Sequence, residues 1–340
     1  MINYISKRIM LAAVTIFFVS FLSYVIIDLP PGDYVDKLIE IQVAIGQMEI
    51  PTAEEEYALR EKYDLNKPML IRYVDWIWKI LSDGNFGPSY GSGSGYTASG
   101  FGTPVSELFG ERIILTIALA AFTMIITWLF SVPVGIYTAV RQHSIGDYTF
   151  TFLGFAGLAV PDFLLGLILM YLMYAYFDQS VGGLFSGPYQ DAPWSFARVI
   201  DMLKHLIIPA VVIGTSGTAG LIRILRNNLL DEIEKPYVVT ARSKGIGKWK
   251  LIIKYPLRVA INPFVSGMGY MLPALISGSV IVSVVLGLNT MGPLLVDALR
   301  SQDVNVAGAI ILMLGVLTVF GTLISDLLLV LVDPRIKLVE

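Results

Sequence analysis

Two carboxylates lie inside apolar stretches of the sequence, where an ionisable side chain could bind an ion or line a solute path. Asp162 follows Val160 and Pro161, and Asp326 lies near the end of the last apolar stretch. A charged group inside a bilayer is costly, so such residues are functional candidates. Pro161 breaks the helix beside Asp162, and broken helices often border translocation paths. Alternatively, Asp162 lies near the membrane interface or caps the restarted helix, and Asp326 forms a structural ion pair or cap.

Side chains for other chemistry are scarce. The chain has no Cys and only two His, His143 and His205, which excludes disulfides and thiolate chemistry and argues against a His-rich metal site. Both His lie near expected membrane boundaries, where we interpret them as interfacial. The tract GSGSGYTASG at 91–100 is typical of a linker, because no Lys-Ser/Thr pair follows its glycines to form a phosphate loop. We therefore expect a chain that is not an enzyme and holds no metal or cofactor of its own.

The elements that carry these residues are predicted to be membrane helices. Of 340 residues, 55% are apolar and 15% are charged, and the mean hydropathy is +0.69, too apolar for an ordinary soluble domain. A helix needs about 20 apolar residues to cross roughly 30 Å of hydrocarbon. The sequence therefore predicts an all-α, polytopic membrane protein with six transmembrane helices, at approximately 9–29, 113–140, 149–177, 205–226, 260–288 and 306–332.

The distribution of basic residues predicts the orientation. Between Arg223 and Arg258 there are nine Lys and Arg against three acidic residues, and basic flanks of short loops stay in the cytoplasm. The N-terminus and the C-terminal tail carry further basic residues, whereas 30–112 carries more acid than base. We predict that both termini are cytoplasmic and that 30–112 lies outside.

This topology divides the chain into three parts. Residues 1–29 hold the N-terminus and the first span, 30–112 form an extracytoplasmic segment, and 113–340 form a core of five spans with a cytoplasmic loop at 227–258. Within the outer segment, the acidic run at 54–56 begins a helix predicted to extend through Tyr63.

The cytoplasmic loop is the most distinctive motif, since residues 237–263 read YVVTARSKGIGKWKLIIKYPLRVAINP. We predict one short helix over NNLLDEIEKPY that ends at Pro236, and a second over VVTARSK, with Gly245 allowing the turn that follows. A short basic helix with small residues suits docking into a groove of a soluble subunit. An amphipathic helix resting on anionic lipid is the alternative.

These residues resemble the permease subunits of binding-protein-dependent ABC importers, in the oligopeptide, dipeptide and nickel branch. That family has a loop of the form Y-V-x-T-A-R-A-K-G, and residues 237–245 read YVVTARSKG. Similar segments follow in order along nearly the whole chain: LPPGDY at 29–34, YDLNKPMLIRYVDWI at 63–77, PVSELFGERI at 104–113, VPDF at 160–163 and DPRI at 333–336.

The resemblance implies a type I ABC-importer permease fold in the cell membrane. One chain would form half of the translocation pathway with a homologous second permease, while two ABC ATPase subunits bind ATP and Mg and an extracytoplasmic binding protein delivers the solute. No nucleic-acid partner is expected. The resemblance assigns ATPase docking to the coupling helix, whose residues here are Tyr237, Thr240, Ala241, Arg242, Lys244 and Gly245.

The solute path and the solute are less defined. Small, polar or proline-flanked positions in the third and fifth spans give the path candidates Asp162, Ser277, Ser279 and Ser283, although a helical Ser often hydrogen-bonds its own backbone. The end of the fifth span reads SVVLGLNTMG at 283–292, where the branch usually has a Glu-Thr-Val-Phe-Ser-Trp-Pro-Gly-Leu-Gly type of stretch. Oligopeptides and short oligosaccharides both remain open as solutes.

Two other classes of membrane protein are alternatives. An ion-coupled secondary transporter would use buried charges and often shows inverted repeats, yet the sequence has one candidate acid and no convincing repeat. A channel could have this composition, but it would not need a loop that resembles an ATPase-docking element.

Overall fold

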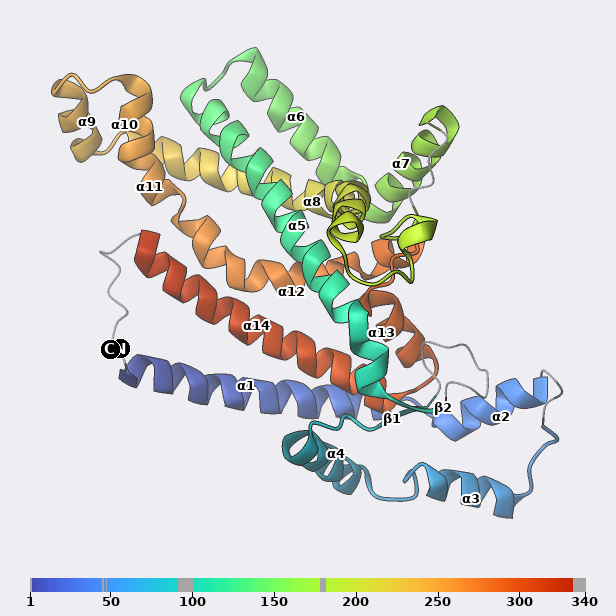
Figure 1. Cartoon of the computed structure of the whole chain (residues 1–340). Coiled ribbons are helices and arrows are strands. Elements are labelled where there is room, and N and C mark those ends of the chain that lie inside the picture. The colour runs from blue at the N-terminus through green and yellow to red at the C-terminus, as the bar shows by residue number, and fades with distance from the viewer. Residues whose placement is uncertain (1, 45, 47, 91–100, 178–181, 333–340) are drawn as a thin grey trace. The chain divides into compact units, whose positions relative to one another are not determined.

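The computed structural model describes residues 2–44, 46, 48–90, 101–177 and 182–332 (Figure 1). The predicted linker at 91–100 and the DPRI motif at 333–336 lie outside the described residues. The chain divides into two compact units, one of residues 1–4, 116–289 and 317–340 and the other of residues 5–115 and 290–316. We call them the loop-bearing unit and the outer-segment unit.

The outer-segment unit holds all the described β structure. Strands β1 (Pro88–Tyr90) and β2 (Phe101–Pro104) pair antiparallel, a small sheet that the all-α prediction did not include. The unit's helices are most of α1 (Ile2–Asp28), α2 (Tyr34–Ala44), α3 (Ala53–Lys62), α4 (Met69–Asp83), the start of α5 (Val105–Val140), α13 (Met291–Arg300) and the start of α14 (Val304–Val332).

Local sequence signals set the ends of the helices in this unit. Thr52 and Glu55 form a capping box at the start of α3, and the helix predicted to extend through Tyr63 ends at Lys62 with Tyr63 as its C-cap. Gly84, at φ 64°, ends α4 in the left-handed conformation that glycine adopts without strain. These caps satisfy backbone groups that the helix ends leave without intrahelical partners.

An aromatic cluster and a buried carboxylate organise the core of this unit. Tyr24, Tyr73 and Trp76 are buried and pack in a cluster with apolar residues from the start of α14. Asp303 is fully buried, and it accepts hydrogen bonds from the Ser89 hydroxyl at 2.8 Å and the Tyr90 amide at 2.7 Å. A carboxylate in this position ties β1 to the first turn of α14.

Helix α8 is the centre of the loop-bearing unit, because it contacts α6, α7, α11 and α12 (Figure 1). It is 38 residues long and contains Pro209. The unit's elements are the rest of α5, α6 (Ile145–Ala159), α7 (Asp162–Phe177), η2 (Gly187–Tyr189), α8 (Phe196–Ile233), α9 (Pro236–Ser243), α10 (Lys248–Lys254), α11 (Pro256–Ala260), α12 (Asn262–Val285) and the rest of α14.

The predicted spans coincide with helices, but not all of them have the length and composition of a membrane span. Among the described residues, three helical stretches do, namely Ile9–Asp28, Val105–Val140 and Val304–Asp326. The pair α6 and α7 would add a fourth, and it is bent by 101° at the break that Pro161 predicted. The predicted fourth and fifth spans correspond to α8 and α12, and α12 contributes a shorter apolar stretch, Ala274–Val285.

Two predicted boundaries differ from the structure. Helix α5 begins at Val105, and a kink at Gly110 (φ 27°, ψ −120°) precedes the predicted start at 113. The separate short helix predicted over 227–236 is wrong, since these residues continue α8 as far as Ile233. Leu225 and Leu229 are both fully buried in a cluster with Ile252 and Phe264. Burial of these side chains stabilises the helical conformation of α8 beyond the predicted fourth span.

Candidate functional site

The candidate docking element is α9, a helix of eight residues between two sharp changes of direction. Lys235 is its N-cap and Pro236 its first helical residue, the position at which a missing amide hydrogen costs least. Gly245 follows with φ 77°, and Gly247 is the N-cap of α10. The sequence predicted this helix and its turn, whereas the second helix that meets it is α10 and not a segment before Pro236.

One face of α9 packs within the chain. Val238 and Ala241 are buried and form a cluster with Leu251 of α10, against which Ile246 and Tyr255 also pack. This apolar contact fixes α9 and α10 as a hairpin. Ala241 therefore faces the chain's own core, and its small side chain allows α9 to lie close to α10.

The other face of α9 is exposed. Thr240, Arg242 and Lys244 all lie on the surface, and the Thr240 hydroxyl donates to the Pro236 carbonyl at 2.9 Å. Tyr237 is 38% exposed, and its hydroxyl donates to the Glu232 carboxylate at 2.5 Å. Glu232 also pairs with Lys235, so the carboxylate at the end of α8 holds the start of α9.

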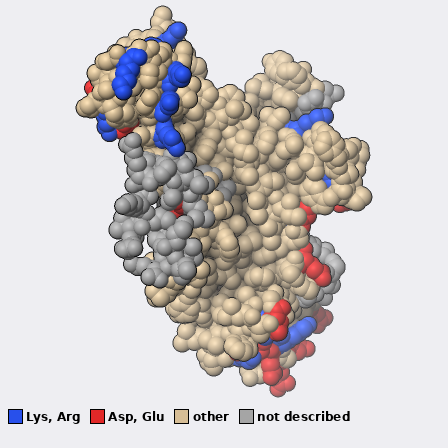
Figure 2. Space-filling model, turned by 60° about the vertical axis from the view of Figure 1, so that its left-hand side comes forward, with Lys and Arg blue, Asp and Glu red and all other residues tan. Residues whose placement is uncertain are grey.

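Helix α10 extends this exposed surface with three lysines and two apolar side chains. Trp249 and Ile253 are 60% and 61% exposed. Figure 2 shows Lys and Arg side chains gathered at its upper left, over α9 and α10. We call this surface the basic face, and its basic residues are Arg242, Lys244, Lys248, Lys250 and Lys254.

The basic face leaves charged and apolar side chains open to solvent. Among the residues that the structure describes, Arg242 and Lys244 form no hydrogen bond or ion pair by their side chains. Their charges are thus available to carboxylates of a partner, while exposed Val239 and Trp249 offer apolar area beside them.

The path candidates occupy different environments. Asp162 is the first residue of α7, half-buried, with the Ser216 side chain of α8 as a hydrogen-bonding neighbour. Ser277 is exposed and donates to the Ala274 carbonyl at 3.3 Å, and Ser279 is buried and donates to the Ile276 carbonyl at 2.8 Å. Both hydroxyls therefore donate to backbone carbonyls of their own helix, as helical serines often do.

Ser283 differs from the other two serines. Its side chain is fully buried, and its hydroxyl oxygen has no hydrogen-bond partner among the described residues. A buried hydroxyl without a partner costs roughly 1–3 kcal/mol. Among the three serine candidates for the solute path, Ser283 is thus the one whose hydroxyl lacks a hydrogen-bond partner among the described residues.

The remaining ionisable candidates have local partners. The His143 amide donates to Asp147 at 2.9 Å, and the His205 ring Nδ1 lies 2.9 Å from the Asp201 carbonyl oxygen. Asp326 is half-buried in α14.

Three structural side chains were missed by the sequence reasoning. Asp147 is buried and pairs with Arg226 of α8 at 3.0 and 3.1 Å, and Ser144 three residues before it is a capping signal that could have identified it. Arg198 is buried, and its guanidinium lies over the rings of Phe185 and Trp194, 4.4 and 4.8 Å from their centroids. Asp303, described above, is the third.

Long apolar helices packed around a helical core define the class of this protein as a multi-pass membrane protein. Residues 131–338 match the family described as "Binding-protein-dependent transport system inner membrane component". The chain belongs to this family.

Curated relatives agree over nearly the whole chain. The oligopeptide transport system permease protein AppB of Bacillus subtilis (strain 168) is 34% identical over 337 residues, covering 99% of this chain and 100% of AppB. The dipeptide transport system permease protein DppB of Escherichia coli (strain K12) is 28% identical, covering 99% of each chain. The nickel import system permease protein NikB of Staphylococcus aureus (strain bovine RF122 / ET3-1) is 27% identical, covering 97% of this chain and 90% of NikB.

A solved structure has the same fold. The MetNI methionine ABC transporter in an inward-facing conformation matches with a TM-score of 0.52 and 15% identity, covering 67% of this chain and 97% of the MetNI chain. The predicted resemblance to an ABC importer permease of the oligopeptide, dipeptide and nickel branch is confirmed, as is the location in the cell membrane. The chain is a transport subunit.

Proposed function

We propose that this chain forms half of the translocation pathway of an ATP-driven importer and couples to an ATPase subunit through α9. The observation that carries the proposal is the basic face, in which a YVVTARSKG segment has one side buried within the chain and the other side exposed. A helix held in this way is suited to insertion into a partner's groove.

The geometry of α8 supports a mechanical role. Its 38 residues make a helix about 57 Å long, and its last turn is joined to α9 through the Tyr237 and Glu232 side chains. Movement of α9 with a closing ATPase pair would displace one end of α8, and the helices packed along α8 would follow. Rigid-body motion of this kind would alternate access between the two sides of the membrane.

The assembly follows from the same proposal. Six spans, with α8 and α12 completing the set, would leave both termini in the cytoplasm beside the ATPases. A homologous second permease would enclose the path, two ABC ATPase subunits would bind ATP and Mg, and a binding protein would deliver solute outside. Asp162, Ser277, Ser279 and Ser283 are the proposed path residues.

We propose short peptides as the solute, because two of the relatives described above are named for oligopeptide and dipeptide transport. A short oligosaccharide is the rival solute. The ligand carried by the cognate binding protein decides between them.

Charge reversal on the basic face tests the docking assignment. The double variant Arg242→Glu/Lys244→Glu should lower ATPase recovery with the tagged chain by about tenfold, since two exposed attractions become repulsions. Both side chains are exposed, so the fold should be kept. Affinity purification from native membranes in mild detergent, with mass spectrometry of the intact complex, measures the recovery.

A matched control is Lys62→Glu in the outer-segment unit, which also reverses an exposed charge and should leave ATPase recovery unchanged. Undiminished ATPase recovery with the double variant would refute docking through α9. Recovery of the unmutated chain alone, under conditions that keep known transporters intact, would favour a secondary transporter or a channel.

A further inference from the structure

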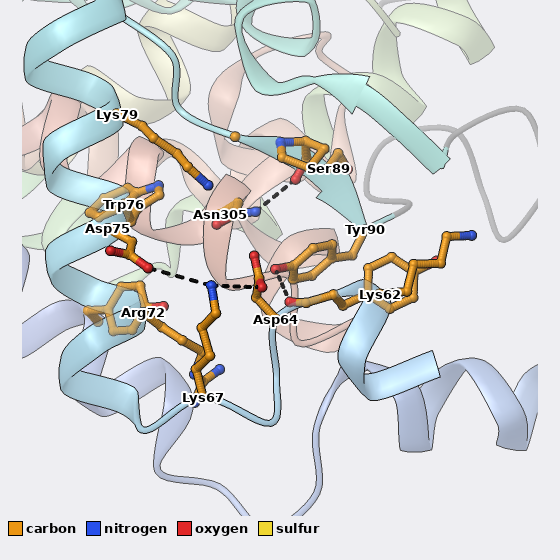
Figure 3. A pocket seen from close by; sticks show the side chains of 14 residues that line it. Lys62, Asp64, Lys67, Arg72, Asp75, Trp76, Lys79, Ser89, Tyr90 and Asn305 are labelled. Atoms are coloured by element: carbon orange, nitrogen blue, oxygen red, sulfur yellow. Dashed lines mark hydrogen bonds and ion pairs between the residues drawn. The ribbon is translucent and has the colours of Figure 1, made fainter. Parts of the chain in front are cut away.

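A cavity of about 330 Å³ lies in the outer-segment unit (Figure 3). Its walls come from α4, the turn after α3, β1 and the first turn of α14. This volume is in the range of small-ligand sites.

One wall of the cavity is formed by side chains on a single face of helix α4. Arg72, Asp75, Trp76 and Lys79 all line the cavity, and spacings of three and four residues place them on one face of the helix. The Trp76 ring is fixed, because its Nε1 donates to the Phe86 carbonyl at 2.9 Å.

The opposite wall is equally well anchored. The Tyr90 backbone amide donates to the Asp303 carboxylate at 2.7 Å. The Asn305 side-chain amide donates to the Pro88 backbone carbonyl at 2.9 Å. The Tyr90 hydroxyl donates to the Tyr63 carbonyl at 3.3 Å. A cavity whose walls are held by such bonds is formed before any ligand arrives.

One side of the cavity carries an excess of negative charge. The Lys67 ammonium lies 3.0 Å from the Asp64 carboxylate and 3.7 Å from the Asp75 carboxylate (Figure 3). The hydrogen bond to Asp64, together with the charges of Asp64 and Asp75, raises the pKa of Lys67. Two carboxylates against one ammonium leave a net negative charge on this trio.

Lys79 supplies a separate positive charge. In Figure 3 its side chain points into the cavity toward Asn305. Lys62 also lines the cavity, and its ammonium lies over the Tyr63 ring, 5.6 Å from the ring centroid. Within the described part of the chain, the Lys79 ammonium forms no ion pair. Arg72 is already neutralised by Asp28, at 2.7 and 2.9 Å.

We propose that this cavity binds a small zwitterion, with the ligand's carboxylate at Lys79 and its ammonium group at Asp64 and Asp75. A short peptide with free termini has this chemistry. The proposal goes beyond the proposed function, because an importer permease requires no solute site in the segment between α1 and α5.

A photoreactive dipeptide tests the site directly. The purified permease complex, reconstituted in nanodiscs without binding protein, is irradiated with alanyl-photoleucine, and the labelled peptides are mapped by mass spectrometry. Labelling is expected within residues 62–90 and should be competed by trialanine. Lys79→Met should lower the labelling about fivefold, as for loss of one partly exposed ion pair. The control Arg300→Met removes an exposed charge of the same unit outside the cavity lining and should not change the labelling.

Blocked probes assign each charge. Labelling by the C-terminally amidated probe should not respond to Lys79→Met, and labelling by the N-acetylated probe should not respond to Asp75→Asn. Equal labelling of Lys79→Met and the unmutated chain would overturn the proposal, as would labelling only outside 62–90. So would a cross-link from Lys79 to the binding protein that free dipeptide does not displace, because that result would identify a protein contact.

Failure of this site is distinguishable from failure of the importer assignment. ATPase recovery and binding-protein-dependent transport are measured on the same Lys79→Met variant. Loss of labelling with ATPase recovery retained supports the site, whereas loss of both would indicate that the variant is misassembled and would overturn the inference.

Discussion

Gly245 sets the direction of the chain between α9 and α10 by a single backbone angle. Its φ is 77°, while Gly247 two residues later has φ −59°, and a Cβ added at either position would meet no atom within 4 Å. The two glycines therefore differ in backbone conformation and not in available space. Only Gly245 occupies the left-handed region that side chains with a Cβ disfavour.

We predict different effects of alanine at these two positions. Gly245→Ala should destabilise the turn by about 1 kcal/mol and weaken ATPase recovery about fivefold. Gly247→Ala replaces the N-cap of α10 by a poorer capping residue, so it should loosen the start of α10 and leave the exchange of the α9 amides unchanged. Hydrogen exchange of the α9 amides and quantitative co-purification measure the two effects. Equal behaviour of the two variants would show that the turn geometry does not matter for docking.

Helix α3 illustrates how a whole element depends on one carboxylate at its start. The Glu55 carboxylate accepts from the Thr52 amide at 2.8 Å and from the Thr52 hydroxyl at 3.0 Å. The backbone bond, followed by the hydroxyl bond, lowers the pKa of Glu55. Because the folded pKa lies below its unfolded value, the stabilisation is complete above the ordinary glutamate pKa and is lost as pH falls through the lowered one.

We therefore predict that acidification below the ordinary glutamate range loosens the first turn of α3. Hydrogen exchange of residues 53–57, corrected for the intrinsic rate at each pH, should accelerate in the native chain. Glu55→Gln should show faster exchange already at neutral pH, with a weaker dependence on pH. Glu54→Gln removes a charge from the same turn while keeping the capping box, so a response identical to Glu55→Gln would contradict the argument.

At the scale of the molecule, the proposed topology places α3 outside the cell and α10 inside. The chain contains no Cys, so a single introduced Cys is the only thiol of the chain that a maleimide can label. Glu54 and Lys250 are both exposed, and neither substitution removes a buried group.

We predict that a membrane-impermeant maleimide labels Glu54→Cys in intact spheroplasts and labels Lys250→Cys only after the membrane is permeabilised. Both variants should be labelled equally in detergent, which controls for thiol reactivity. The reverse pattern would invert the topology, and labelling of both from outside would remove α10 from the ATPase side.

The sequence by itself determined the features that depend on neighbouring residues. Pro161 predicted the break between α6 and α7, and Gly245 predicted the turn after α9. Long apolar runs predicted six spans, of which three helices and the bent pair α6 and α7 have the length and composition of a span among the described residues. The YVVTARSKG segment identified the family that the comparisons confirm. Proline and glycine act through their own backbone angles, so their effects can be read locally.

Only the tertiary structure decided which faces are buried and which distant groups meet. Ala241 and Thr240 are adjacent in sequence, yet contact with Leu251 turns Ala241 inward and leaves Thr240 exposed. Burial of Leu229 continued α8 through residues predicted as a separate helix. The cavity beside Lys79 joins α4 to Asn305, more than two hundred residues away, and such contacts depend on long-range packing that local sequence patterns do not encode.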